Sequence, residues 1–227
     1  MKIIAVIAAH PDDEVLGCAG TIALHSQQGD QVHVIFMADG ENARTNQTPQ
    51  HSNRQAAVYA ALTTLKVESV QFLNFADNAM DSIPLLKIIQ ALESKLTLLK
   101  PDTIYTHFAH DLNIDHRLTY QAVLTACRPQ PGQSVKAIYC FEVPSSTEWG
   151  SATEQGFRPQ LFVEISQVLS DVNAALACYA AELRPWPHSR SLEAIAARQK
   201  YRGSTVGVTA AEAFMIEREI RSLKKCS

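Results

Sequence analysis

The residues of this 227-residue chain best suited to chemistry are His10, Asp12 and Asp13. They directly follow an apolar run, residues 3–8, that is typical of a buried strand. Ligands of open α/β sheets bind at the carboxyl ends of the strands. His10 and Asp13 are three residues apart across a bend and can converge on one ion. Adjacent carboxylates repel each other without a cation, and histidine nitrogen and carboxylate oxygen both suit zinc. This pattern predicts a metal site.

A third ligand must come from elsewhere, because catalytic zinc sites typically have three protein ligands and one position left for water. The segment after the strand expected at 103–106 contains His107, His110 and His116. In a doubly wound sheet the first and fourth strands are neighbours where the topology reverses, so the loops that follow them share a crevice. The spacing of the three histidines does not choose among them.

The acidic residues after Pro11 also have an ordinary structural interpretation. Proline favours an extended His10 and fits the first turn of a helix, which places the three acids 12–14 at a helix N-terminus. Acids are common there because they complement the helix dipole. That would explain one or two of them, but it does not explain a histidine before the proline.

Short apolar runs alternate with helical patterns, as in β-α-β units. Strands are expected at 2–9, 31–37, 70–72, 103–106, 136–140 and 161–165, and helices at 12–27, 53–64, 84–99, 115–127, 167–181 and 192–201. The pattern predicts an α/β fold: a Rossmann-like, doubly wound, mostly parallel sheet in the order 3-2-1-4-5, with helices on both faces. No Gly/Ser-rich linker separates the C-terminal helices and short strands, so residues 1–227 are expected to form a single domain.

Composition narrows the class of partner. The formal charge is −3, and the longest Lys/Arg run is the pair 224–225, which argues against nucleic acid or a membrane surface. No apolar stretch reaches the length of about 18 residues that a membrane span needs. The five cysteines have no C-x-x-C spacing and indicate free thiols in the cytoplasm. Small, polar substrates remain possible, and so does a homo-oligomer.

The segments 9–14 and 115–117, with Gly17 and Gly20 behind the first, resemble the LmbE-like or PIG-L family of zinc-dependent sugar de-N-acetylases. The resemblance extends from the first strand to about residue 127. It implies one Zn²⁺ per chain, with Fe²⁺ as the alternative ion. The implied zinc ligands are His10, Asp13 and His116, and the implied catalytic base is Asp12. The implied reaction removes the acetyl group from an N-acetylated amino sugar of the N-acetylglucosamine type, linked to a nucleotide, lipid or glycoside, and releases acetate and an amine.

The chain departs from the family three residues before the last ligand, where members often carry histidine and this chain has Asn113. Asn113 could donate a hydrogen bond to an oxyanion or to the substrate, and His110 could supply an imidazole from nearby. Asp115 is expected to orient a metal ligand, as outer carboxylates do.

Further substrate contacts are expected from basic residues at the same edge of the sheet. Arg54 is preferred to Arg44, because the family tends to place an arginine at the start of the helix expected at 53–64. Its planar fork of donors would recognise sugar hydroxyls or a phosphate. His188 and the neighbouring Arg190 are further candidates, in a segment whose prolines exclude a helix.

Two other functions compete with hydrolysis. A non-hydrolytic Rossmann-like module that binds nucleotides or sugars would need a glycine-rich first turn, but this chain has two aspartates there. An iron(II)-dependent enzyme could use the same two histidines and carboxylate, although a spare carboxylate beside the ligands fits hydrolysis better.

Overall fold

The computed structural model describes residues 1–38, 51–150 and 155–221. These residues form a seven-stranded sheet in the order β3-β2-β1-β4-β5-β7-β6. The strands are β1 (Ile3–Ala8), β2 (Gln31–Ala38), β3 (Ser69–Phe75), β4 (Thr103–His107), β5 (Ala137–Phe141), β6 (Leu161–Glu164) and β7 (Ala211–Glu219). The helices are α1 (Asp13–Gln27), α2 (His51–Thr64), α3 (Leu85–Leu99), α4 (Ile114–Ala126), α5 (Leu169–Cys178) and α6 (Leu192–Ser204). The predicted α/β class and the order of the first five strands are confirmed.

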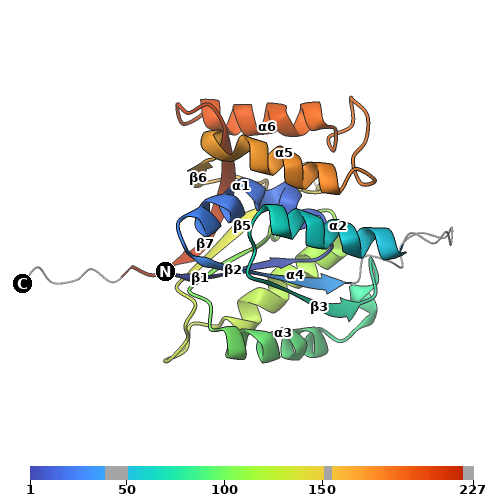
Figure 1. Cartoon of the computed structure of the whole chain (residues 1–227). Coiled ribbons are helices and arrows are strands. Elements are labelled where there is room, and N and C mark those ends of the chain that lie inside the picture. The colour runs from blue at the N-terminus through green and yellow to red at the C-terminus, as the bar shows by residue number, and fades with distance from the viewer. Residues whose placement is uncertain (39–50, 151–154, 222–227) are drawn as a thin grey trace, which may run out of the picture.

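Strand β1 lies inside the sheet, parallel to β2 on one side and to β4 on the other. Its side chains alternate between two cores. Ile4, Val6 and Ala8 pack on the side of α1 and α2, whereas Ala5 and Ile7 pack on the side of α3 and α4. Figure 1 shows these two helical layers, with α5 and α6 stacked outside α1 and α2. Burial on both faces explains why β1 appears in the sequence as an unbroken apolar run.

Strand β7 was missed by the sequence analysis. It runs antiparallel to both β5 and β6 and lies between them. Four of its nine residues are Glu or Arg, which hides the strand pattern. The first of these, Glu212, is buried and accepts hydrogen bonds from the backbone N–H groups of Gly20 (2.7 Å) and Thr21 (2.8 Å). These groups lie just after Cys18, whose φ of −154° interrupts α1. Glu212 therefore ties α1 to the sheet.

The C-terminal third packs on the same sheet as the rest. Helix α5, shorter than the expected 167–181, contacts α1 and α2, and α6 contacts β7. The first residues of the helix expected at 167–181 form a 3₁₀ turn instead, η3 (Ser166–Val168), and α5 begins after it. Another 3₁₀ turn, η2 (Thr147–Trp149), follows β5. No helix within the described ranges is long and apolar enough to cross a membrane.

Helix α1 approaches the sheet closely at its glycines. A Cβ on Gly17 would lie 2.5 Å from the Phe141 ring, and one on Gly20 would lie 2.4 Å from Ile165 Cγ2. We expect Gly20→Ala to lower the free energy of unfolding by about 1–3 kcal/mol, because the added methyl overpacks the core. Urea denaturation would measure the change. The control is Gly156→Ala, where no described atom lies within 4 Å; its effect should stay below about 1 kcal/mol. Equal stabilities of the two variants would contradict the close packing.

Candidate metal centre

The chain turns sharply after β1 and enters α1. The backbone N–H of His10 donates to Asp13 Oδ2 (2.9 Å), and the N–H of Asp13 donates to the carbonyl of His10 (3.3 Å). Between them Asp12 has a φ of 111°, in the left-handed region that side chains rarely adopt. Such a conformation persists only where surrounding contacts determine it, and it clusters at functional sites. The turn brings the side chains of His10 and Asp13 together.

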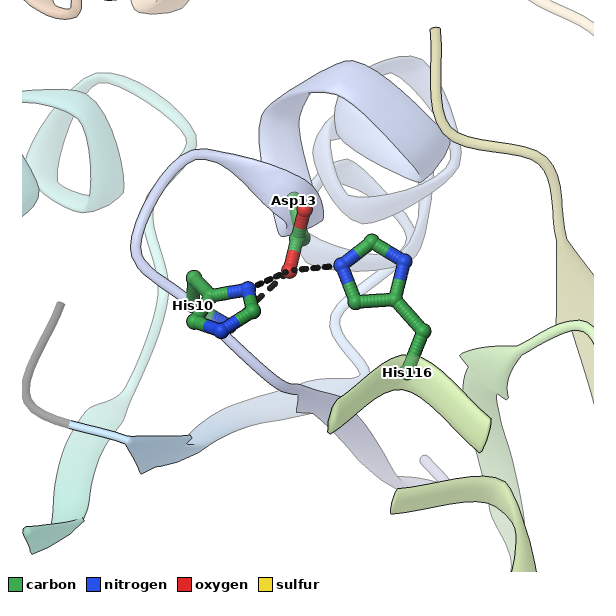
Figure 2. A group of neighbouring side chains, drawn as sticks. All are labelled: His10, Asp13 and His116. Carbon is green, nitrogen blue, oxygen red and sulfur yellow. Dashed lines mark hydrogen bonds and ion pairs between the residues drawn. The ribbon is translucent and has the colours of Figure 1, made fainter. Parts of the chain in front are cut away.

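Three side chains converge here: His10 from the turn itself, Asp13 from α1 and His116 from α4, as Figure 2 shows. Asp13 Oδ2 lies 3.4 Å from His10 Nδ1 and 3.3 Å from His116 Nε2. Tetrahedral ligands at about 2.0–2.1 Å from a zinc ion would be about 3.3–3.4 Å apart. All three side chains are buried, and the other oxygen of Asp13, Oδ1, has no hydrogen-bond partner among the described residues. These residues therefore fit a divalent ion, and they form a candidate His/Asp/His metal site.

The ring of His10 is oriented by acidic groups on its other side. Its Nε2 lies 3.0 Å from Asp77 Oδ1 and 3.1 Å from Asp115 Oδ2. Asp115 in turn accepts hydrogen bonds from the backbone N–H groups of Asn78 (2.7 Å) and Met80 (3.1 Å). A metal-bound histidine commonly donates its second N–H to a carboxylate, which fixes the tautomer. Here that leaves Nδ1 for an ion. His10, Asp77 and Asp115 are also close enough to form a second possible metal group.

His116 is oriented in the same way from a different element. Its Nδ1 lies 3.1 Å from Asp111 Oδ1, so Nε2 is the nitrogen that faces Asp13. Asp111 also accepts hydrogen bonds from the hydroxyls of Ser146 and Thr147, just after β5. Burial would raise the pKa of Asp111, but these hydrogen bonds and His116 lower it to about 2. Asp111 is therefore an ionised carboxylate that holds the histidine in place.

The other two histidines after β4 lie differently. His107 Nε2 accepts the backbone N–H of Ala9 (2.8 Å), and its ring stacks on His116 at 3.9 Å. Burial keeps the pKa of His107 well below its usual value, so the ring is neutral and that nitrogen is occupied. His110 packs edge to face on Phe108. Of the three histidines left open by spacing, the structure brings only His116 into a metal group with His10 and Asp13.

Asp12 lies next to this group without belonging to it. One carboxylate oxygen, Oδ2, accepts a hydrogen bond from Arg190 Nη1 (2.8 Å). The backbone N–H of Asp12 donates to Glu14 (3.0 Å), whose other oxygen accepts the hydroxyl of Tyr179 (2.7 Å). Burial raises the pKa of Asp12 to about 7, although the positive charge of Arg190 opposes the rise. This carboxyl group is thus poised to exchange a proton near neutral pH.

Two other predicted site residues, Arg54 and Asn113, form hydrogen bonds near the metal group. Arg54 donates to the carbonyl of Pro11 (3.2 Å) and so reaches the turn. Asn113 caps α4 by accepting the N–H of Asp115 (2.8 Å), and its amide nitrogen donates to Asn78. Both ends of the Asn113 amide are therefore used within the protein, and its N–H group does not point freely toward a substrate.

His188 lies in the loop that carries Arg190. Its Nδ1 accepts the backbone N–H of Arg190 (3.0 Å), and its ring contacts Trp149. Arg44 lies outside the described residues. The sequence analysis missed Asp77 and Asp111, which have no motif of their own; the position of Asp111 in the loop after β4 was the available signal.

Protons and a metal ion should compete for this site. Burial would lower the pKa of His116, but Asp13 and Asp111 raise it to about 9, and the pKa of His10 is also raised. Because a metal binds neutral imidazole, binding below pH 9 must release protons. We expect the apparent association constant for Zn²⁺ to rise between pH 6 and 8, by about tenfold per pH unit for each proton released. Calorimetry in buffers of different ionisation enthalpy would measure the release. An affinity independent of pH would contradict binding at these histidines.

The fold and the site together define the class: a doubly wound α/β protein with a His/Asp/His centre at the carboxyl edge of its sheet and an acid beside it. The sequence model of the PIG-L family, described as GlcNAc-PI de-N-acetylase, matches residues 5–127, more than half of the chain. A relative in Escherichia coli K12, "Uncharacterized deacetylase YaiS", is 31% identical over 179 residues, which cover 77% of this chain and 88% of the relative. The chain belongs to the PIG-L family of metal-dependent de-N-acetylases.

The chain is also similar to a hydratase and to a deacetylase of solved structure. The 4-oxalmesaconate hydratase of Pseudomonas putida KT2440 is 26% identical over 82% of this chain and 76% of its own length. The solved structure of N,N'-diacetylchitobiose deacetylase from Pyrococcus horikoshii superposes with a TM-score of 0.76 over 96% of this chain and 84% of that one, at 20% identity. The second match supports the fold.

Proposed function

We propose that this protein is a zinc-dependent hydrolase that removes the acetyl group from an N-acetylated amino sugar of the N-acetylglucosamine type. Membership of the PIG-L family supports deacetylation of N-acetyl sugars. The observation that best supports the chemistry is the buried Asp12 carboxylate, which has one oxygen on Arg190 and lies next to the His10, Asp13 and His116 group.

Zinc is the proposed ion because two histidine nitrogens and one carboxylate oxygen form the ligand set of many catalytic zinc sites. Iron(II) accepts the same donors and is the alternative. When bound, either ion would polarise the acetyl carbonyl and lower the pKa of a water, for zinc from about 15.7 to about 7. His10, Asp13 and His116 would hold it, and Asp77, Asp111 and Asp115 would keep the two imidazoles oriented.

The residues around the ligands would handle protons. Asp12, in its ionised form, takes the proton of the attacking water and then donates it to the amine that leaves. The amide C–N bond breaks, and the products are acetate and the free amino sugar. Glu14 fixes the backbone of Asp12. We assign substrate contacts to Arg54, His110 and His188. We assign a positioning role to Asn113, which caps α4 by accepting the N–H of Asp115.

The hydratase relative suggests a second function, addition of water to the double bond of an unsaturated acid. An anionic substrate of that kind would approach Asp12, Asp77 and Asp115. Arg54 and Arg190, which could attract it, both pair with acidic residues, Glu182 and Asp12 respectively. A bound divalent ion would add positive charge to this site, so charge alone does not separate the two substrates. Membership of the PIG-L family and the similarity to a deacetylase favour the N-acetyl sugar.

The test is release of acetate and free amine from a panel of N-acetylglucosamine derivatives, including nucleotide, lipid and glycoside conjugates, by zinc-loaded and iron-loaded protein. Protein treated with a chelator is the control, and 4-oxalmesaconate is included as a hydratase substrate. Turnover of any amide that disappears on chelation supports the proposal. If the protein hydrates 4-oxalmesaconate and releases no acetate from any member of the panel, the hydratase function replaces the proposed deacetylase function.

A further inference from the structure

Arg190 brings the C-terminal third of the chain into the site. It lies in the loop between α5 and α6, and its Nη1 donates to Asp12 Oδ2 at 2.8 Å. The side chain of Asp12 is only 4% exposed and that of Arg190 is 21% exposed. Among the described residues no other hydrogen bond reaches the Asp12 carboxylate, so Oδ1 is left open while Oδ2 is held.

The guanidinium group is itself held in place. Its Nε donates to Ser145 Oγ (2.7 Å) and to the carbonyl of Pro144 (3.3 Å), in the loop after β5. The backbone N–H of Arg190 donates to His188 Nδ1 (3.0 Å). The planar group is thus fixed through Nε, and Nη1 is directed at Asp12 by the rigid geometry of the fork.

The same loop after β5 also supports the metal group. Ser146 and Thr147, which follow Ser145 directly, donate their hydroxyls to Asp111, and Asp111 orients His116. One short segment therefore places both the cation that contacts Asp12 and the carboxylate that contacts a metal ligand. The relative position of Asp12 and the metal group depends on this segment.

We propose that Arg190 is a positioning residue of the active site, which holds Oδ2 of Asp12 so that Oδ1 remains the oxygen that exchanges protons with the reacting groups. This inference rests on the proposed hydrolase function. A simple counter-charge for a buried carboxylate would not need the contacts to Ser145 and Pro144, and a lysine would serve equally well. A positioning role needs the planar fork.

Three variants test the proposal in the full-length, zinc-loaded protein. Arg190→Met removes the charge and the fork, and Arg190→Lys keeps only the charge. The matched control is Arg184→Met in the same loop, whose exposed side chain caps the carbonyls of Ala181 and Leu183. We expect Arg190→Met to lower kcat about 100-fold, the scale of a misplacement of about 1 Å, with zinc affinity within twofold of wild type. Arg190→Lys should recover less than a tenth of the loss, and Arg184→Met should match wild type.

Two further measurements distinguish a positioning role of Arg190 from a role in folding, and they do so whatever the substrate is. In a fourth variant, Arg190→Ala, added guanidinium ion should restore part of the activity, because it can reoccupy the space beside Asp12. Crystal structures of the zinc-loaded wild type and of Arg190→Met should show the Asp12 carboxylate fixed in the first and turned away in the second. This comparison needs no substrate, so it decides the inference even if the wild type deacetylates nothing on the panel.

The inference is overturned if Asp12 keeps its place in Arg190→Met, or if Arg190→Lys restores full activity. If the wild type binds zinc but deacetylates no amide, the proposed function is refuted. The role of Arg190 is then decided by the comparison of the two crystal structures.

Discussion

An Asp13→Asn variant is expected to bind zinc at least about 100-fold more weakly than wild type, since loss of an outer partner of a ligand already costs about 10–100-fold. Deacetylation should disappear with the metal. Asp13 Oδ2 is the atom that both His10 Nδ1 and His116 Nε2 face, at 3.4 Å and 3.3 Å. An amide keeps the shape of the side chain but removes its negative charge, and neutral amide oxygen is a poor zinc ligand beside two imidazoles.

The control for Asp13→Asn is Asp81→Asn, the same change at an exposed position in η1 (Met80–Ser82). Titration with a fluorescent zinc chelator would give the affinities, and circular dichroism would show that both variants fold. Asp77→Asn serves as a second comparison, because Asp77 belongs to the other possible metal group with His10 and Asp115. A larger loss of affinity in Asp77→Asn than in Asp13→Asn would place the ion in that second group.

An Asp12→Asn variant is expected to keep its metal and lose catalysis. We expect kcat to fall by about 10²–10⁴-fold, the usual contribution of a general base, with zinc affinity changed less than threefold. The side chain of Asp12 is outside the His10, Asp13 and His116 group, and its Oδ2 contacts Arg190. Asparagine can still accept that hydrogen bond through its oxygen, so the change removes the proton acceptor and little else. Normal turnover with bound zinc would exclude Asp12 as the base.

The pH dependence of the wild type should support the same role. Burial raises the pKa of Asp12 to about 7. The ionised form is the base, so activity should fall as the pH drops through this pKa. A divalent cation nearby favours the ionised form further. The acid limb of the kcat profile is therefore expected at or below pH 7, and it should be absent from the residual activity of Asp12→Asn.

Local patterns in the sequence were enough to predict the central part of the fold. The apolar runs of β1, β2 and β4 indicated buried strands. Their alternation with helices predicted a doubly wound sheet, and the order of the first five strands followed from that topology. The same reasoning failed for β7. The buried Glu212 is satisfied by backbone N–H groups of α1, almost two hundred residues earlier in the chain. No local pattern reports such a partner.

By itself the sequence placed His10, Asp12 and Asp13 at the end of a buried strand, because an apolar run, a proline and adjacent acids act within a few residues of one another. Only the tertiary structure decided which histidine after β4 joins them: the backbone N–H of Ala9 occupies His107, while Asp111 turns His116 toward Asp13. It also decided that Asn113 caps a helix and that Arg190 meets Asp12 from 178 residues away. Hydrogen bonds that orient a side chain depend on neighbours in space, and the packing of the sheet and its helices determines those neighbours.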